Sequence, residues 1–172
     1  VTIEEPEETG TTFMENALLK AHYYAKATNR PWLADDSGIT VDALNGAPGV
    51  YSARYAGHHG DDQANNEKLI RELQGKSDRT GHYVCALALV YPDGREVTAE
   101  GYCDGLVQDE PKGDNGFGYD PYFYVPEFKK TMAELSIEEK EKISHRGRAL
   151  RELINKLWYF RTIWYSSYKY VI

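Results

Sequence analysis

The sequence is poor in cysteine and in basic residues, and both shortages argue against whole classes of protein. Its 172 residues include two cysteines, Cys85 and Cys103, in separate strand-like stretches, so neither a disulfide framework nor a zinc site is expected. The 20 basic residues against 27 acidic ones give a net charge of -7, which argues against non-specific binding to a nucleic acid backbone. An acidic protein that binds a polyanion would need a metal ion or a few well-placed Lys and Arg.

Long apolar stretches are also missing. No run reaches the roughly 18 residues that a membrane-spanning helix needs, and the first residues lack the basic and then apolar pattern of a secretion signal. We therefore expect a cytoplasmic protein without a membrane partner. The hydrophobic content of 41% is ordinary for a globular chain, and we expect one domain with one core.

Helix and strand signals alternate along the chain. The spacing of Thr12 and Glu15 predicts a capping box, and apolar residues then recur every fourth position. The expected elements are a helix over 12–29, short strands over 32–34 and 39–41 with a turn at 36–38, a helix beginning at Asp61 or Asp62, a hairpin over 82–107, a helix capped by Ser136 and a last amphipathic helix that reaches Leu157. Because the middle of the chain is a hairpin, we expect an α/β fold with a mixed central sheet and flanking helices.

Two adjacent carboxylates, Asp35 and Asp36, follow the apolar residues 32–34. Unpaired charge is costly next to apolar side chains, so a positive group should lie nearby. At the end of a strand, such carboxylates suit Mg²⁺, which binds hard oxygen ligands and commonly takes one or two carboxylates together with substrate phosphates. The alternative is an Asx turn at 36–38 that binds nothing.

Two later segments also carry candidate binding groups. Residues 144–146, Ser-His-Arg, together with Lys140, offer donors for a phosphate or a keto oxygen. The alternative is that the serine only caps the last helix. Residues 117–120, Phe-Gly-Tyr-Asp, could stack on a base and bind a ring nitrogen, or they could form an ordinary turn with Phe117 packed inward.

Four motifs, taken in order, resemble those of the inosine triphosphate pyrophosphatase family. They are EETGTTFMENALLKA, LADDSGITVDALNGAPGVYSARYAG, GDNGFGYDPYF and MAELSIEEKEKISHRGRAL, and the similarity extends from about Glu7 to about Leu157. The resemblance implies the fold of that family and a Mg²⁺-dependent hydrolase. Such an enzyme converts the triphosphates of inosine, deoxyinosine and xanthosine to the monophosphate and pyrophosphate, which keeps these nucleotides out of nucleic acid. It also implies a homodimer, which is common in the family.

The resemblance implies roles for individual residues as well. Asp36 resembles the general base that activates water and also contacts Mg²⁺, with Glu8 and Asp35 as further metal ligands. The positions that resemble phosphate and base contacts are Lys20, Ser37, Phe117, Gly118, Tyr119, Asp120, Lys140, His145 and Arg146.

Both ends of the chain depart from the family pattern. Family members open with a strand and a loop that carries a [Ser/Thr]-x-Asn-x-x-Lys motif, and this sequence starts after that point, so we expect residues 1–157 to form an N-terminally incomplete nucleotide pyrophosphatase domain. Residues 158–172 form an aromatic tail unlike the family, and one hypothesis is that Ile163 to Tyr170 fill the place of the missing strand. Two alternatives to an active enzyme remain, a nucleotide-binding protein without turnover and a truncated relic of the family.

Overall fold

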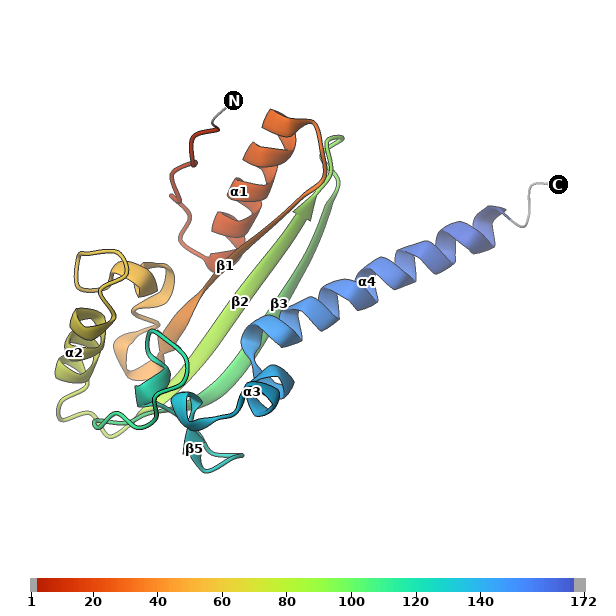
Figure 1. Cartoon of the computed structure of the whole chain (residues 1–172). Coiled ribbons are helices and arrows are strands. Elements are labelled where there is room, and N and C mark those ends of the chain that lie inside the picture. Colours follow the sequence, from red (N-terminus) through yellow and green to blue (C-terminus); the bar gives the residue numbers. More distant parts are fainter. Residues whose placement is uncertain (1–2, 169–172) are drawn as a thin grey trace.

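The computed structural model describes the backbone of residues 3–168 and the side chains of residues 3–159. One antiparallel sheet forms the centre, with helices on both of its faces (Figure 1). The regular elements are α1 (Phe13–Thr28), β1 (Trp32–Val41), α2 (Asp62–Glu72), β2 (Thr80–Val90), β3 (Glu96–Val107), β4 (Phe123–Val125), β5 (Lys130–Thr131), α3 (Ile137–Ile143) and α4 (His145–Tyr168). This order confirms the predicted α/β class.

Helix α1 begins as the sequence predicts. The Glu15 N–H donates to the Thr12 hydroxyl at 3.1 Å and the Glu15 carboxylate accepts from the Thr12 N–H, which completes the capping box. Asn29 ends the helix in the left-handed conformation. The predicted caps at Asp61 and Ser136 are also present, so these local signals were sufficient to place three helix starts.

The strand order in the described part of the chain is β1-β2-β3-β4-β5, and all four strand pairs there are antiparallel. The prediction of a mixed sheet is therefore wrong for residues 3–168. The reason is that each described strand pairs with the next one along the chain, and consecutive neighbours that double back run antiparallel. No helix crosses over to make a parallel pair among these strands.

The predicted turn at 36–38 is also wrong. Strand β1 continues through these residues, with Asp36 opposite Ala86 and Gly38 opposite Val84. The glycine serves close packing instead of a turn, because a Cβ at Gly38 would lie 2.4 Å from the Ser52 hydroxyl oxygen. The two aspartates thus lie inside a strand and not at its end.

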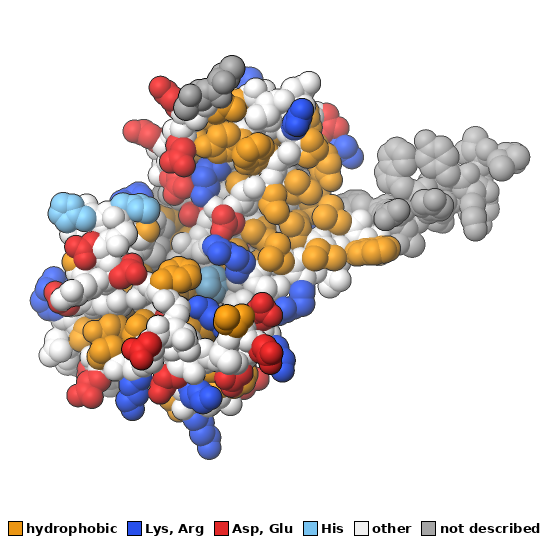
Figure 2. All heavy atoms as spheres, in the orientation of Figure 1, with side chains coloured by type: hydrophobic (Ala, Val, Ile, Leu, Met, Phe, Trp, Pro, Cys, Tyr) orange, Lys and Arg blue, Asp and Glu red, His pale blue; other side chains and the backbone are white. Residues whose placement is uncertain are grey.

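Helices α1 and α4 cover opposite faces of the sheet. Side chains alternate between the two faces of a strand, so Ala86 packs with α1 whereas Cys85 and Leu87 pack with α4. Helix α4 lies very close to β3, since a Cβ at Gly101 would lie 2.0 Å from the His145 carbonyl oxygen. Hydrophobic side chains remain exposed on the sheet beside α4 in Figure 2.

Helix α4 continues past Leu157 to Tyr168 and leads away from the sheet (Figure 1). The hypothesis that Ile163 to Tyr170 replace a strand is therefore wrong over residues 163–168; residues 169 and 170 lie outside the described part of the chain. The sequence contains no Gly or Pro after Gly147, so no helix-breaking residue ends α4 where it passes the edge of the sheet. None of the helices in residues 3–168 has the length and apolar character required to cross a membrane.

Candidate active site

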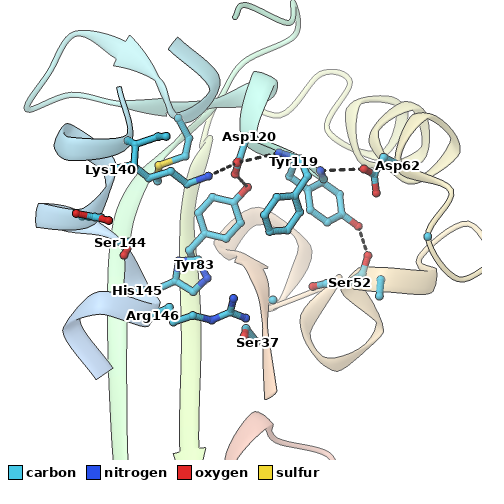
Figure 3. A pocket seen from close by; sticks show the side chains of 18 residues that line it. Ser37, Ser52, Asp62, Tyr83, Tyr119, Asp120, Lys140, Ser144, His145 and Arg146 are labelled. Atoms are coloured by element: carbon cyan, nitrogen blue, oxygen red, sulfur yellow. Dashed lines mark hydrogen bonds and ion pairs between the residues drawn. The ribbon is translucent and has the colours of Figure 1, made fainter. Parts of the chain in front are cut away.

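A pocket of about 440 Å³ opens between β1, β2, the loop before β4 and the start of α4 (Figure 3). This volume lies in the range of small-molecule sites. Eight of the nine residues predicted to contact the substrate come together here from segments far apart in the sequence. They are Ser37, Phe117, Gly118, Tyr119, Asp120, Lys140, His145 and Arg146.

Asp120 is the polar centre of this pocket and is 5% exposed. One carboxylate oxygen accepts from the Tyr83 hydroxyl at 2.7 Å, and the other accepts from the Lys140 ammonium at 2.7 Å and from the Phe117 N–H at 3.2 Å. The turn needs a glycine at 116, where φ is +89° and a Cβ would lie 2.2 Å from the same carboxylate. Asp120 is therefore a fixed acceptor.

Phe117 does not pack inward, so the alternative of an ordinary turn with a buried ring is wrong. Its side chain is 74% exposed at the pocket, and the Lys140 ammonium lies 5.3 Å from the ring centroid. The adjacent Gly118 has a φ of +61°, and the next two residues are buried whereas the Phe117 ring stays at the surface. An exposed aromatic ring beside a cation suits a planar, electron-rich ligand.

His145 lies deeper in the same pocket and is neutral at pH 7. Burial, helped by the cations of Arg146 and Lys140, lowers the pKa of His145 to about 4. Its ring stacks on Tyr83 with centroids 4.9 Å apart, and its Nδ1 is buried with no hydrogen-bond partner among residues 3–168. Ser144 caps α4, since its hydroxyl accepts from the Gly147 N–H at 3.0 Å, and the three residues 144–146 also line the pocket.

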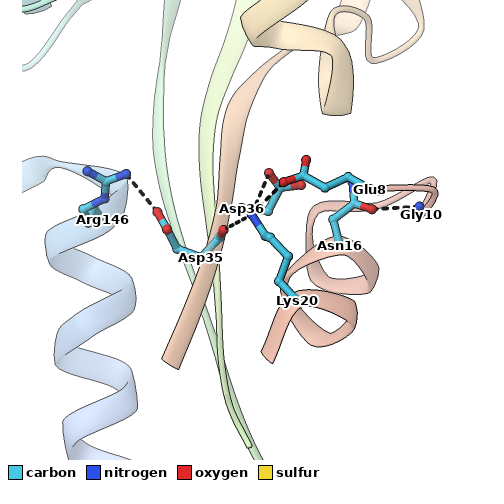
Figure 4. Close-up of polar contacts among 7 residues, drawn as sticks. All are labelled: Glu8, Gly10, Asn16, Lys20, Asp35, Asp36 and Arg146. Atoms are coloured by element: carbon cyan, nitrogen blue, oxygen red, sulfur yellow. Dashed lines mark hydrogen bonds and ion pairs between the residues drawn. The ribbon is translucent and has the colours of Figure 1, made fainter. Parts of the chain in front are cut away.

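The second half of the site is a small charged group on the α1 side of β1 (Figure 4). The Lys20 ammonium lies 2.9 Å from a Glu8 carboxylate oxygen and 3.9 Å from Asp36 Oδ1, and it donates to the Asp35 carbonyl at 2.5 Å. The positive group beside the Asp36 carboxylate is thus a lysine of α1. This group brings together Lys20, Glu8 and Asp36 as the sequence predicts.

Asp36 is held in an environment that disfavours its charge. Burial raises the pKa of Asp36 to about 6, with smaller contributions from Glu8 and Asp35, whereas Asn16 and Lys20 oppose the rise. Its Oδ2 is buried and has no hydrogen-bond partner in the described part of the chain. A carboxylate with this pKa is ionised at neutral pH yet close to the range in which it can take up a proton.

Asp35 does not join the charged group. Adjacent side chains of a strand point to opposite faces, and Asp35 accepts a hydrogen bond from Arg146 at 2.9 Å on the α4 face, as Figure 4 shows. The ion pair connects β1 to the first turn of α4. Asp35 therefore lies on the side of the pocket, apart from Glu8 and Asp36.

The carboxylates of Glu8 and Asp36 are the candidate metal ligands of the site. No group of three or more His, Cys, Asp or Glu side chains in residues 3–168 is arranged to hold one. Magnesium does not require such a group, because it keeps several waters and uses one or two carboxylates plus substrate phosphates. Glu8 and Asp36 contact a common lysine, and Asp36 Oδ2 lacks a partner, so these two residues fit Mg²⁺ that binds together with a phosphate substrate.

Three residues of the site were not predicted from the sequence. Tyr83 was seen only as part of a strand and Asp62 only as a possible helix cap, yet the Asp62 carboxylate accepts from the Gly118 N–H at 2.9 Å. Asn16 is 1% exposed on the apolar face of α1 and accepts from the Gly10 N–H at 2.7 Å. Asn16 could have been noticed in the sequence, because it is a polar residue next to the repeating apolar positions of α1. Tyr83 and Asp62 could not, because their contacts are with residues distant in the sequence.

The chain is similar to curated bacterial proteins over most of its length. A dITP/XTP pyrophosphatase of Bacillus anthracis is 55% identical over 159 residues, which cover 90% of this chain and 79% of that protein. The corresponding protein of Bacillus subtilis (strain 168) is 55% identical over 152 residues, 87% of this chain and 77% of that protein.

Solved structures give the same result. The Ham1 protein of Staphylococcus aureus has a TM-score of 0.85 at 51% identity and covers 88% of this chain and 79% of its own. A HAM1 protein from Coxiella burnetii has a TM-score of 0.86 at 47% identity, with 90% and 80% covered. A profile of the Ham1 family matches residues 1–156, which confirms the resemblance seen in the motifs. The chain belongs to the Ham1 family.

Proposed function

We propose that the protein hydrolyses non-canonical purine nucleoside triphosphates, those of inosine, deoxyinosine and xanthosine, to the monophosphate and pyrophosphate. Relatives named dITP/XTP pyrophosphatase at 54 to 55% identity support this activity. The observation that carries the proposal is the position of two groups on one strand. Ser37 lines the base-sized pocket, and the preceding Asp36 belongs to the charged group with Lys20 and Glu8.

The pocket residues suit a purine with a keto oxygen at position 6. The exposed Phe117 ring is available to stack on the base, and the half-buried His145 is neutral, so it can donate one N–H to a keto oxygen. Adenine would place an amino group at the same point, and two donors facing each other in a buried site are strongly unfavourable. This arrangement gives a physical reason for rejection of ATP.

The charged group suits attack of water on a phosphoanhydride. Asp36 is the general base, because its raised pKa of about 6 matches proton uptake near neutral pH. Lys20 places a positive charge between Glu8 and Asp36 and can orient a phosphate. Glu8 and Asp36 would hold Mg²⁺, which when bound neutralises phosphate charge. We leave Asp35 out of the proposed metal site because its ion pair with Arg146 occupies it on the other face.

We also propose that the protein acts in the cytoplasm as a homodimer, without a nucleic acid or membrane partner. The two free cysteines, both buried, suit a reducing compartment, and the net charge of -7 disfavours nucleic acid. The division into a domain over 1–157 and a tail over 158–172 stays a prediction. Nucleotide binding without turnover is the competing function, and product analysis separates it from the proposed one.

The test is to incubate the protein with inosine triphosphate and with ATP, each with Mg²⁺ or with a chelator, and to resolve the products by anion exchange. The matched pair of variants is Asp36→Asn and Asp35→Asn, neighbours that face opposite sides of β1. We expect inosine monophosphate and pyrophosphate from the wild type only with Mg²⁺, and loss of turnover in Asp36→Asn. Release of the diphosphate and phosphate, or equal turnover of both nucleotides, would refute the proposal.

A further inference from the structure

Tyr83 is a buried residue that contacts two polar groups of the pocket at once. It lies on β2, is 7% exposed, and extends beneath the pocket (Figure 3). Its hydroxyl donates to Asp120 Oδ1 at 2.7 Å, and its ring stacks on His145 with an interplanar angle of 13°. Asp120 and His145 come from segments 25 residues apart in the sequence, and Tyr83 is a direct contact that both of them share.

The hydroxyl is well suited to hold a carboxylate. Burial and the neighbouring Asp120 raise the pKa of Tyr83 well above its usual value, so it remains a donor throughout the physiological range. Lys140 and the Phe117 N–H both bind the other oxygen of Asp120, so Tyr83 supplies the hydrogen bond that Oδ1 makes within the described part of the chain. Without that donor, Asp120 could rotate toward Lys140 and away from the ligand.

The carboxylate has one further acceptor position on Oδ1, because each carboxylate oxygen can accept two hydrogen bonds. A 6-keto purine carries a proton on ring nitrogen 1, whereas adenine has an unprotonated acceptor there. An Asp120 that is fixed as an acceptor therefore favours the keto purine only while its orientation is held.

We propose that Tyr83 is a positioning residue for base recognition, which holds Asp120 and His145 in the orientation that distinguishes a 6-keto purine from adenine. The inference deepens the proposed function, since it rests on the base occupying this pocket. It concerns binding of the base and not the hydrolytic step. Tyr83 itself need not touch the nucleotide.

The experiment measures binding of inosine and adenosine monophosphates by titration calorimetry, because these ligands cannot be turned over. Tyr83→Phe removes the hydroxyl and keeps the ring that stacks on His145. We expect the Kd of inosine monophosphate to rise about tenfold, in line with loss of a hydrogen bond to a charged group, and the Kd of adenosine monophosphate to change by less than about twofold. The control is Tyr102→Phe, which removes an exposed tyrosine hydroxyl that donates to Glu100 outside the pocket. It should leave both Kd values unchanged.

A double variant distinguishes a positioning role of Tyr83 from a purely structural one. In an Asp120→Asn background, Tyr83→Phe should produce little additional loss of inosine monophosphate binding, because the two residues act through one contact. A lower melting temperature with an unchanged ratio of the two Kd values would overturn the inference, and so would additive effects in the double variant. Absence of inosine monophosphate binding by the wild type would also overturn it. Normal binding by a wild type that does not hydrolyse inosine triphosphate would refute the pyrophosphatase alone.

Discussion

Replacement of the proposed general base should make the metal-free protein more stable. Burial raises the pKa of Asp36 from 3.8 to about 6, so at neutral pH the charged carboxylate has a higher free energy in the folded state than in the unfolded chain. A shift of roughly two pKa units at about 1.4 kcal/mol each corresponds to a destabilisation of the folded state by at most about 3 kcal/mol. The Asp36 side chain is 13% exposed, which leaves little solvent to reduce this penalty, and we expect Asp36→Asn to add about 2 kcal/mol.

The pH dependence has a definite sign. The folded-state pKa lies above the unfolded one, so the relative stability of the wild type is full below pH 3.8 and falls as the pH rises through about 6. The difference between Asp36→Asn and wild type should therefore be small at pH 4 and reach its full size above pH 7.

The assay is urea unfolding of both proteins in a metal chelator at several pH values. Asp35→Asn serves as the control, because Asp35 is paired with Arg146 and its replacement should add no stability. A variant Asp36→Asn that is less stable than wild type at pH 8, or equally stabilised at pH 4 and pH 8, would refute the account of this carboxylate. The stabilisation would also show that the buried charge of Asp36 lowers the stability of the fold and is retained for function.

Three further predictions test other parts of the structure. Gly101→Ala should destabilise the fold by about 3 kcal/mol or more in urea unfolding, because a Cβ would lie 2.0 Å and 2.4 Å from backbone atoms of α4; a loss under about 1 kcal/mol would contradict the close packing of that helix on β3. Asp62→Ala should raise KM for inosine triphosphate severalfold with little change in kcat, because its carboxylate holds the Gly118 N–H; an unchanged KM would show that this contact does not fix the pocket loop. The hydrogen bond to Asp104 raises the pKa of His82, so its stabilising contribution is full below pH 6.5 and lost at higher pH; His82→Gln should reduce urea stability at pH 5.5 more than at pH 9, and the reverse order would exclude the raised pKa.

Helix starts could be predicted from local signals in the sequence, whereas features that depend on contacts across the fold could not. The capping boxes at Thr12 and Ser136 could be predicted because both partners lie within four residues. Position 38 is a glycine because the Ser52 side chain packs against its backbone and leaves no room for a Cβ. Ser52 is distant in sequence, so the local pattern around Gly38 predicted a turn instead. The sheet was expected to be mixed for the same reason, since strand direction depends on which strands meet.

The site shows the same division. Motif resemblance was enough to collect Phe117, Asp120, Lys140 and His145, and the structure brings them into one pocket. Pattern alone could have separated the two aspartates, because adjacent strand residues face opposite sides, but this needed the strand to be recognised first. The part played by Tyr83 could not be inferred, because nothing near it in the sequence indicates a partner 37 residues away.

The most direct test of the central claim is a competition in one reaction. Equal concentrations of inosine triphosphate and ATP are mixed with the protein and Mg²⁺, and both nucleotides and pyrophosphate are followed over time. The account predicts that inosine triphosphate is consumed first, with one pyrophosphate released for each inosine monophosphate formed, while ATP persists. Consumption of both at similar rates, or inosine diphosphate as the first product, would contradict it.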